Sequence, residues 1–83
     1  MVRVKLYGSA RALAAQEELS LELAPGDRLA DLLRRIAPDP RRIPEGIASA
    51  ILVNGRNCAF REGLDTPLAD GDLVEVLPIV TGG

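Results

Sequence analysis

The residues that most clearly indicate a chemical role are the two glycines at positions 82 and 83. A chain carboxylate is a poor electrophile, so it must be activated, and a second protein must enclose it to do so. Glycine lets bare backbone enter a narrow channel that any Cβ would obstruct. From Pro78 to Gly83 the extended chain reaches about 20 Å, enough to enter a partner's buried site. We therefore expect Gly83 to carry the reacting group and a partner to supply catalysis.

The absence of histidine from the sequence removes most other chemistry. A Ser-His-Asp or Cys-His nucleophile, a histidine general base and the usual His-containing zinc site all need that side chain. Asp70 and Asp72 could ligate a metal, but two carboxylates around a glycine more often stabilise a turn. We expect no metal site, no bound cofactor and no enzyme activity of the chain on its own.

Cys58 is the single cysteine, and one thiol cannot build an internal disulfide framework, which agrees with a reducing compartment. The Cys58 thiol could carry a persulfide, with Arg56 as its only obvious pKa-lowering neighbour. A small packing residue is the more common role for a cysteine in such surroundings. We interpret Cys58 as structural.

The charge pattern argues against nucleic-acid and membrane partners. Ten basic and 12 acidic residues give a net charge of −2 and are interspersed along the chain. The only aromatic residues, Tyr7 and Phe60, offer no stacking platform for bases. The sequence has neither the order of a signal peptide nor an apolar run near the roughly 20 residues that span a bilayer. We expect a cytoplasmic protein.

The elements that must position the two glycines follow from apolar patterning. Alternation with a period of two, or a short apolar run, predicts strands at residues 2–7, 19–23, 47–53 and 73–77 and a short edge piece at 56–60. The first two strands should pair in antiparallel fashion, with a short helical turn at residues 10–14 that Ser9 could cap. Asn54-Gly55 is a strong turn signal.

A helix is predicted where four apolar residues recur at i, i+3, i+4 and i+7. These residues are Leu29, Leu32, Leu33 and Ile36. Asp27 is placed to cap this helix, and Arg34-Arg35 lie near its C-terminal end. The Arg34-Arg35 and Arg41-Arg42 pairs could contact an acidic partner or ATP, although solvation explains them equally well. Three prolines make residues 38–46 an irregular connection.

Strands and one main helix in this order predict an α+β domain with a mixed sheet crossed by one helix. The turn-rich residues 67–72, the strand that follows, and Pro78-Ile79-Val80-Thr81 before the two glycines occur together in the last seventeen residues. This combination resembles the ubiquitin-like β-grasp sulfur carriers over the whole chain in outline. We expect residues 1–77 to form the domain and residues 78–83 to form a flexible, extended tail.

Two lines of this family are similar, namely the small subunit of molybdopterin synthase and the sulfur carrier of thiamine biosynthesis. Pro78 before Ile79-Val80-Thr81 looks more like the molybdopterin synthase subunit, although Ile79 replaces a proline common in that line. This departure leaves carriers for tRNA thiolation or cysteine synthesis open. A ubiquitin-like protein modifier and a plain binding module remain alternatives of another class, and Lys5, the only lysine, mildly disfavours self-conjugation.

The resemblance implies a role for each residue of the tail. An adenylyltransferase related to ubiquitin-activating enzymes would use ATP to adenylate Gly83, and sulfur from a persulfide would displace AMP to give a thiocarboxylate. Gly82 and Thr81 would pass through the partner's channel. Pro78, Ile79 and Val80 would form the surface gripped by a larger partner, such as the large synthase subunit in molybdenum cofactor biosynthesis.

Overall fold

A computed structural model describes residues 1–37, 39, 41, 43 and 47–78. Its strands are β1 (Val2–Leu6), β2 (Glu18–Leu21), β3 (Ile51–Val53), β4 (Arg56–Asn57) and β5 (Leu73–Val76). Its α-helices are α1 (Arg11–Ala14) and α2 (Leu29–Ile36). Short 3-10 helices are η1 (Gly8–Ala10), η3 (Ile47–Ala50), η4 (Cys58–Phe60) and η5 (Gly63–Asp65).

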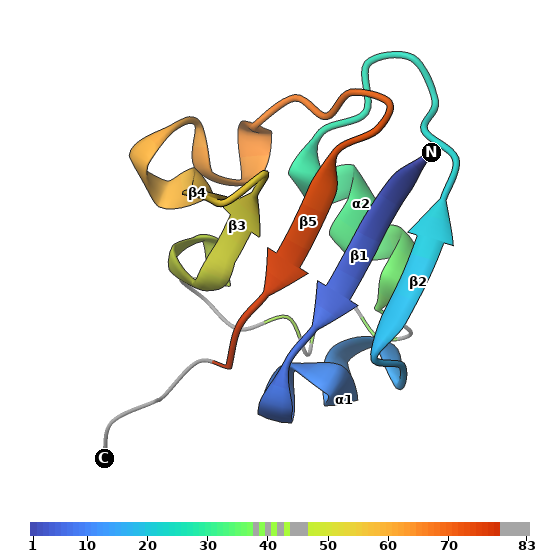
Figure 1. The fold of residues 1–83 in the computed structure, drawn as a ribbon, viewed down its shortest axis with the longest axis vertical. Coiled ribbons are helices and arrows are strands. Elements are labelled where there is room, and N and C mark those ends of the chain that lie inside the picture. Colours follow the sequence, from blue (N-terminus) through green and yellow to red (C-terminus); the bar gives the residue numbers. More distant parts are fainter. Residues whose placement is uncertain (38, 40, 42, 44–46, 79–83) are drawn as a thin grey trace.

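The five strands form one mixed sheet in the order β2-β1-β5-β3-β4. The first and last strands of the chain lie side by side in its centre and run parallel, with Val4 opposite Val74 (Figure 1). The β1–β2, β3–β5 and β3–β4 pairs are antiparallel, which confirms the expected pairing of the first two strands. Helix α2 crosses one face of this sheet, as the sequence predicts.

The core lies between α2 and the sheet face that it covers. The four predicted helix residues are all buried, and no more than 6% of any of them is exposed. Alternate strand residues complete the core, namely Val2, Val4, Leu6, Ile51, Val53, Val74 and Val76. The apolar face of the helix, which repeats about every 3.6 residues, therefore packs on the apolar face of the strands, which repeats every two.

Truncating Leu33 to alanine should remove much of this small domain's stability. Its side chain is 1% exposed, and the change leaves a cavity between helix and sheet. We expect the free energy of unfolding to fall by about 2–5 kcal/mol in chemical denaturation. A fall below about 0.5 kcal/mol would be typical of a surface position and would contradict the assignment of the helix face.

Two strand predictions were wrong at their ends. Residues 47–50 form the 3-10 helix η3 instead of a strand, and only Ile51–Val53 pair in the sheet. Ile47 and Ala50 are both buried, and residues three apart share one side of a 3-10 helix. In the edge piece only β4 pairs, because the Asn57 side chain accepts a hydrogen bond from the Ala59 N–H and starts η4. Asn54-Gly55 does form the β3–β4 turn, with φ of 53° and 83°.

Neither predicted helix cap is found. Helix α1 has no side-chain cap, since η1 leads into it and Ala10 already has helical angles of −64° and −21°. The N-cap of α2 is Arg28, whose N–H donates to the Asp31 carboxylate at 2.9 Å. Arg34 and Arg35 lie in the last turn of α2, as expected.

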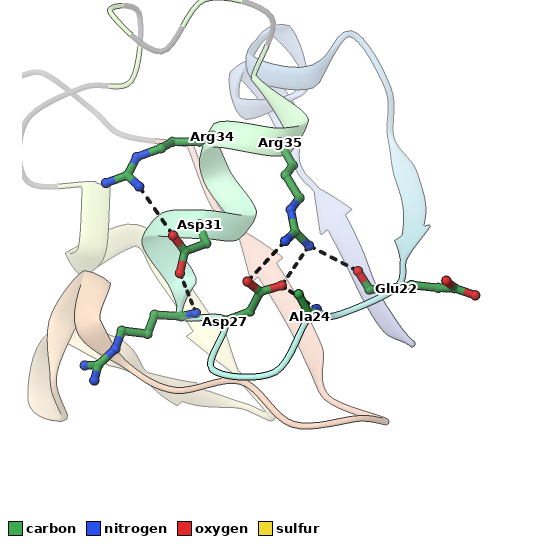
Figure 2. A network of polar contacts seen from close by, with 7 residues as sticks. Glu22, Ala24, Asp27, Asp31, Arg34 and Arg35 are labelled. Atoms are coloured by element: carbon green, nitrogen blue, oxygen red, sulfur yellow. Dashed lines mark hydrogen bonds and ion pairs between the residues drawn. The ribbon is translucent and has the colours of Figure 1, made fainter.

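Asp27 instead joins the β2–α2 connection to the last turn of α2, as Figure 2 shows. Its carboxylate accepts from the Ala24 N–H at 2.7 Å and forms an ion pair with Arg35 at 2.7 Å. Arg35 also donates to the Glu22 carbonyl at 3.1 Å. Asp27 is buried, and its carboxylate oxygens accept from the Ala24 N–H and the Arg35 guanidinium. These bonds take the place of the predicted bond to the start of the helix.

Arg34 and Arg35 provide a matched pair for testing this network. Among the described residues, Arg34 contacts the partly exposed Asp31 at 3.3 Å, whereas Arg35 contacts a buried carboxylate and a backbone carbonyl. We expect Arg35→Ala to lower the free energy of unfolding by about 1–3 kcal/mol. Arg34→Ala should cost less than about 0.5 kcal/mol. Equal losses in urea titrations would mean that the Asp27–Arg35 contact adds nothing to stability.

Candidate functional site

The candidate site begins where β5 ends. Strand β5 is followed by Leu77 and then by Pro78, which is exposed. Of the predicted site residues only Pro78 is described. The other predicted site residues, Ile79, Val80, Thr81, Gly82 and Gly83, lie outside the described residues, and their roles stay predictions.

Hydrogen bonds hold the end of β5 from both sides. The Tyr7 N–H donates to the Val76 carbonyl at 2.9 Å, and the Leu77 N–H donates to the Ala50 carbonyl at 2.8 Å. Pro78 has no N–H and a fixed φ, so the ladder of backbone hydrogen bonds cannot continue through it. The sheet therefore fixes the chain up to the residue before Pro78.

A side-chain bond reinforces this end of the sheet. The Tyr7 hydroxyl donates to the Glu75 carboxylate at 2.7 Å, joining the residue after β1 to β5. This hydrogen bond is the largest cause that raises the pKa of Tyr7, followed by burial and by the charge of Glu75. A raised pKa keeps the phenol protonated, and so able to donate, well above neutral pH.

A shallow open hollow lies beside the same end of β1. It is lined by Lys5, Leu6, Tyr7, Gly8, Arg11, Glu17 and Glu18. Its charges are of both signs, and Arg11 is already paired with Glu17. The hollow therefore has no strong preference for a charged ligand of either sign.

The residues that could have been a nucleophile or metal ligands, Cys58, Asp70 and Asp72, have structural roles. Cys58 lies in the core with 0% exposure, and burial raises the pKa of its thiol, so it is poorly suited to act as a nucleophile. Asp72 accepts from the Ala69 N–H at 2.8 Å and from the Asn54 amide at 2.9 Å, which confirms the turn role. Asp70 is paired with the N-terminal amine of Met1.

The described residues, 1–37, 39, 41, 43 and 47–78, include Arg41 and both arginines of α2. There Arg41 meets Asp39 at 3.1 Å, and both arginines of α2 have carboxylate partners. No cluster of three metal-ligating side chains occurs in these ranges. None of the helices in them has the length and apolar character that crossing a membrane requires.

Sequence reasoning missed Tyr7 and Ala50 at the base of the tail. They come from the segments after β1 and before β3, which neighbour β5 only in the folded sheet. The signal was indirect, because a parallel β1–β5 pair would place the residue after β1 beside the end of β5. The parallel pairing itself could not be read from either strand alone.

Comparison with known proteins places the whole chain among small carrier proteins. A model of the ThiS family matches residues 4–83. A protein from Archaeoglobus fulgidus, assigned as a sulfur carrier protein, is 50% identical over 34 residues. That match covers 41% of this chain and 39% of the relative, so it spans less than half of either protein.

Solved structures are similar over nearly their full length. A Pyrococcus furiosus protein assigned as molybdopterin converting factor subunit 1 is 34% identical, with a TM-score of 0.72 over 95% of this chain and 97% of that one. Small archaeal modifier protein 1 from Methanosarcina acetivorans is 32% identical, with a TM-score of 0.69 and coverage of 99% and 95%.

The third structure is a complex. A chain in the complex of subunits 1 and 2 of molybdopterin-converting factor from Helicobacter pylori is 28% identical, with a TM-score of 0.60 and coverage of 99% and 97%. These proteins share the mixed five-stranded sheet with its single main helix, which confirms the β-grasp fold. The chain belongs to the ThiS family of small, ubiquitin-like sulfur carriers.

Proposed function

We propose that the chain is the sulfur-donating small subunit of a molybdopterin synthase and that it acts through a thiocarboxylate at Gly83. The main support for the proposal is the end of the central strand β5, which is held by hydrogen bonds and is followed by Leu77, Pro78 and a sequence that runs to Gly82-Gly83. Five residues beyond Pro78 can reach about 17 Å when extended. A rigid domain would thus present a reactive carboxylate at a distance from its own surface.

The proposed chemistry needs no active site in the chain itself. The Gly83 carboxylate attacks the α-phosphate of ATP on a ubiquitin-activating-enzyme-like adenylyltransferase, and pyrophosphate leaves. A persulfide sulfur then attacks the acyl carbon and expels AMP, forming an acyl disulfide. A thiol cleaves its S–S bond, which releases the thiocarboxylate and leaves a disulfide on the donor. The carrier binds no cofactor in this scheme, and the partner binds ATP.

The sulfur acceptor belongs to a second partner, the large synthase subunit. Pro78, Ile79 and Val80 would contact that subunit, while Thr81 and Gly82 would pass through its channel. Glycine at position 82 suits this role because bare backbone needs the least width. Support comes from the relatives assigned as molybdopterin converting factor subunit 1, one of which was solved together with subunit 2.

A second candidate function is that of a protein modifier joined through Gly83 to lysines of other proteins. The 32% identity to small archaeal modifier protein 1 favours it. The same activated Gly83 would serve both functions, since an amine can attack the acyl adenylate as a sulfur nucleophile does. The two proposals therefore differ in the acceptor alone.

Deletion of the gene in its native host tests the proposed pathway. We expect molybdopterin to be lost and to return with the intact gene, but not with a gene lacking the Gly83 codon. Normal molybdopterin with loss of thiamine, thiolated tRNA or cysteine would assign the chain to another sulfur pathway. Normal levels of all four, with loss of protein conjugates, would support the modifier instead.

A further inference from the structure

Gly8 lies against the proline from which the tail begins. It follows Tyr7, opens η1 and has a φ of +55°. A Cβ built on Gly8 would lie 2.8 Å from Cγ of Pro78, 3.7 Å from its Cβ and 3.9 Å from its Cδ. Side-chain carbons do not approach so closely, so residue 8 has room for glycine only.

This close approach separates Gly8 from the other glycines that the structure describes. Gly26, Gly55, Gly63 and Gly71 also have positive φ, but a Cβ on any of them would meet no atom within 4 Å. At these four positions glycine is explained by backbone conformation alone. At Gly8 a second constraint is added, and it concerns Pro78.

We propose that Gly8 is a positioning residue that sets the direction in which the chain leaves the sheet at Pro78. Through that direction it controls how accurately Gly83 is presented to an activating enzyme. The inference rests on the proposed function for its consequence, but the contact itself belongs to the fold. Nothing in the proposed chemistry of the tail requires a particular residue at position 8.

The hydrogen bonds around this contact decide which side yields to an added methyl group. The Gly8 carbonyl accepts from the Arg11 backbone N–H and, at 3.2 Å, from Arg11 Nε, so Gly8 is held within the turn. Pro78 is exposed and has no N–H to bind it to the sheet. The Cγ atom of Pro78 belongs to a closed ring in which a change of pucker moves it only a little, so we expect relief of the clash to move the main chain as well.

The expected consequence is misdelivery of Gly83 with the rest of the domain intact. A shift of a few tenths of an ångström at Pro78 can grow along the residues that follow. A misplacement of about 1 Å at a reacting centre can cost about 100-fold in rate. A surface on the folded domain that docks to the enzyme would be unchanged, so the loss should appear in kcat more than in KM.

Gly8→Ala is the test variant, and Gly63→Ala is its matched control. Gly63 has nearly the same φ, +59°, so both variants place alanine at a similar positive φ, but only alanine at position 8 meets Pro78. In ATP–pyrophosphate exchange, below the melting temperature of both, we expect Gly8→Ala to lower kcat between about tenfold and 100-fold. Gly63→Ala should keep the wild-type kcat, and an equal loss in both variants would overturn the proposal.

A second substitution tests whether Pro78 transmits the effect. Pro78→Ala removes the Cγ atom that lies 2.8 Å from the built Cβ and leaves only a contact of 3.7 Å. Gly8→Ala should therefore lower kcat by less than about twofold when added to Pro78→Ala, because the two changes are coupled. The same fold loss in both backgrounds would show that Gly8 acts elsewhere and would overturn the inference.

The contact can also be tested without activity or folding of any variant. In the wild-type protein, NMR should show a nuclear Overhauser effect between the Gly8 Hα protons and the Pro78 Hγ protons, and its absence would overturn the inference. If the wild type is not adenylated at all, the proposed function fails, whereas this signal still reports on the contact. The two failures are thus distinguishable.

Discussion

Removing Gly83 is expected to abolish activation by the cognate adenylyltransferase while the melting temperature stays unchanged. Deletion shortens the reach by about 3.3 Å and presents the carboxylate of Gly82 in its place. A displacement of this size exceeds the roughly 1 Å that can cost about 100-fold in rate, so we expect a loss beyond 100-fold in ATP–pyrophosphate exchange. Gly83 has no side chain to bury in a core, so we expect an unchanged thermal melt.

Adding one alanine after Gly83 should be equally damaging. The extension places the reactive position inside a peptide bond and brings a Cβ into a channel suited to bare backbone. The control is Gly63→Ala, which leaves the tail intact and should keep the wild-type activation, as expected for a change away from the reacting group. Full activity of the deletion or the extension variant, in folded protein, would contradict both the carrier and the modifier proposals.

Placing a charge at position 80 is expected to remove binding of the large synthase subunit. Val80 is one of the two apolar residues between Pro78 and Thr81, and a desolvated carboxylate in a protein contact is costly. Val80→Asp should weaken binding by about 30-fold or more, the loss of roughly 2 kcal/mol or more that is typical of an interface hot spot. Calorimetric titration of the large subunit measures this loss.

Phe60→Asp is the control for that experiment. Phe60 is 89% exposed on η4, so the same kind of change is made at an apolar residue outside the tail. We expect its affinity to stay within about twofold of wild type, as for a surface change outside an interface. If Val80→Asp binds as tightly as Phe60→Asp, residues 78–80 are not the surface that the large subunit grips.

The fold was predictable where one pattern determined both the element and its buried face. The apolar residues at i, i+3, i+4 and i+7 predicted α2, and the alternation in β1 and β5 predicted which of their residues are buried. The errors came where several partners compete for one group. Asp27 had the position of a cap, yet Arg35, eight residues later, and the Ala24 N–H take its carboxylate. Residues 47–50 were apolar enough to predict a strand, but they form a 3-10 helix that also buries Ile47 and Ala50.

The candidate site likewise has one part that the sequence indicates and one part that depends on the fold. The prediction of a reactive end at Gly83 rests on the order of residues in the sequence alone, and it stays a prediction. The base of the tail is formed where Tyr7, Gly8 and Ala50 contact Val76, Pro78 and Leu77, respectively. These contacts arise only because the sheet makes their strands neighbours. No local pattern marks such residues, because their roles depend on which strands become neighbours. The strand order had to be known before Gly8 could be distinguished from a glycine that is needed only for the conformation of a turn.

Mass spectrometry of the protein from its native host can detect the sulfur that we propose at Gly83. We predict a fraction in which sulfur replaces one terminal oxygen, localised to Gly83 by fragmentation and absent from a host without the activating enzyme. Oxidation gives nearly the same mass gain, so fragments with Met1 and Cys58 must be inspected. A gain confined to those residues, with an ordinary carboxylate at Gly83 even after incubation with ATP, activating enzyme and persulfide donor, would contradict the account.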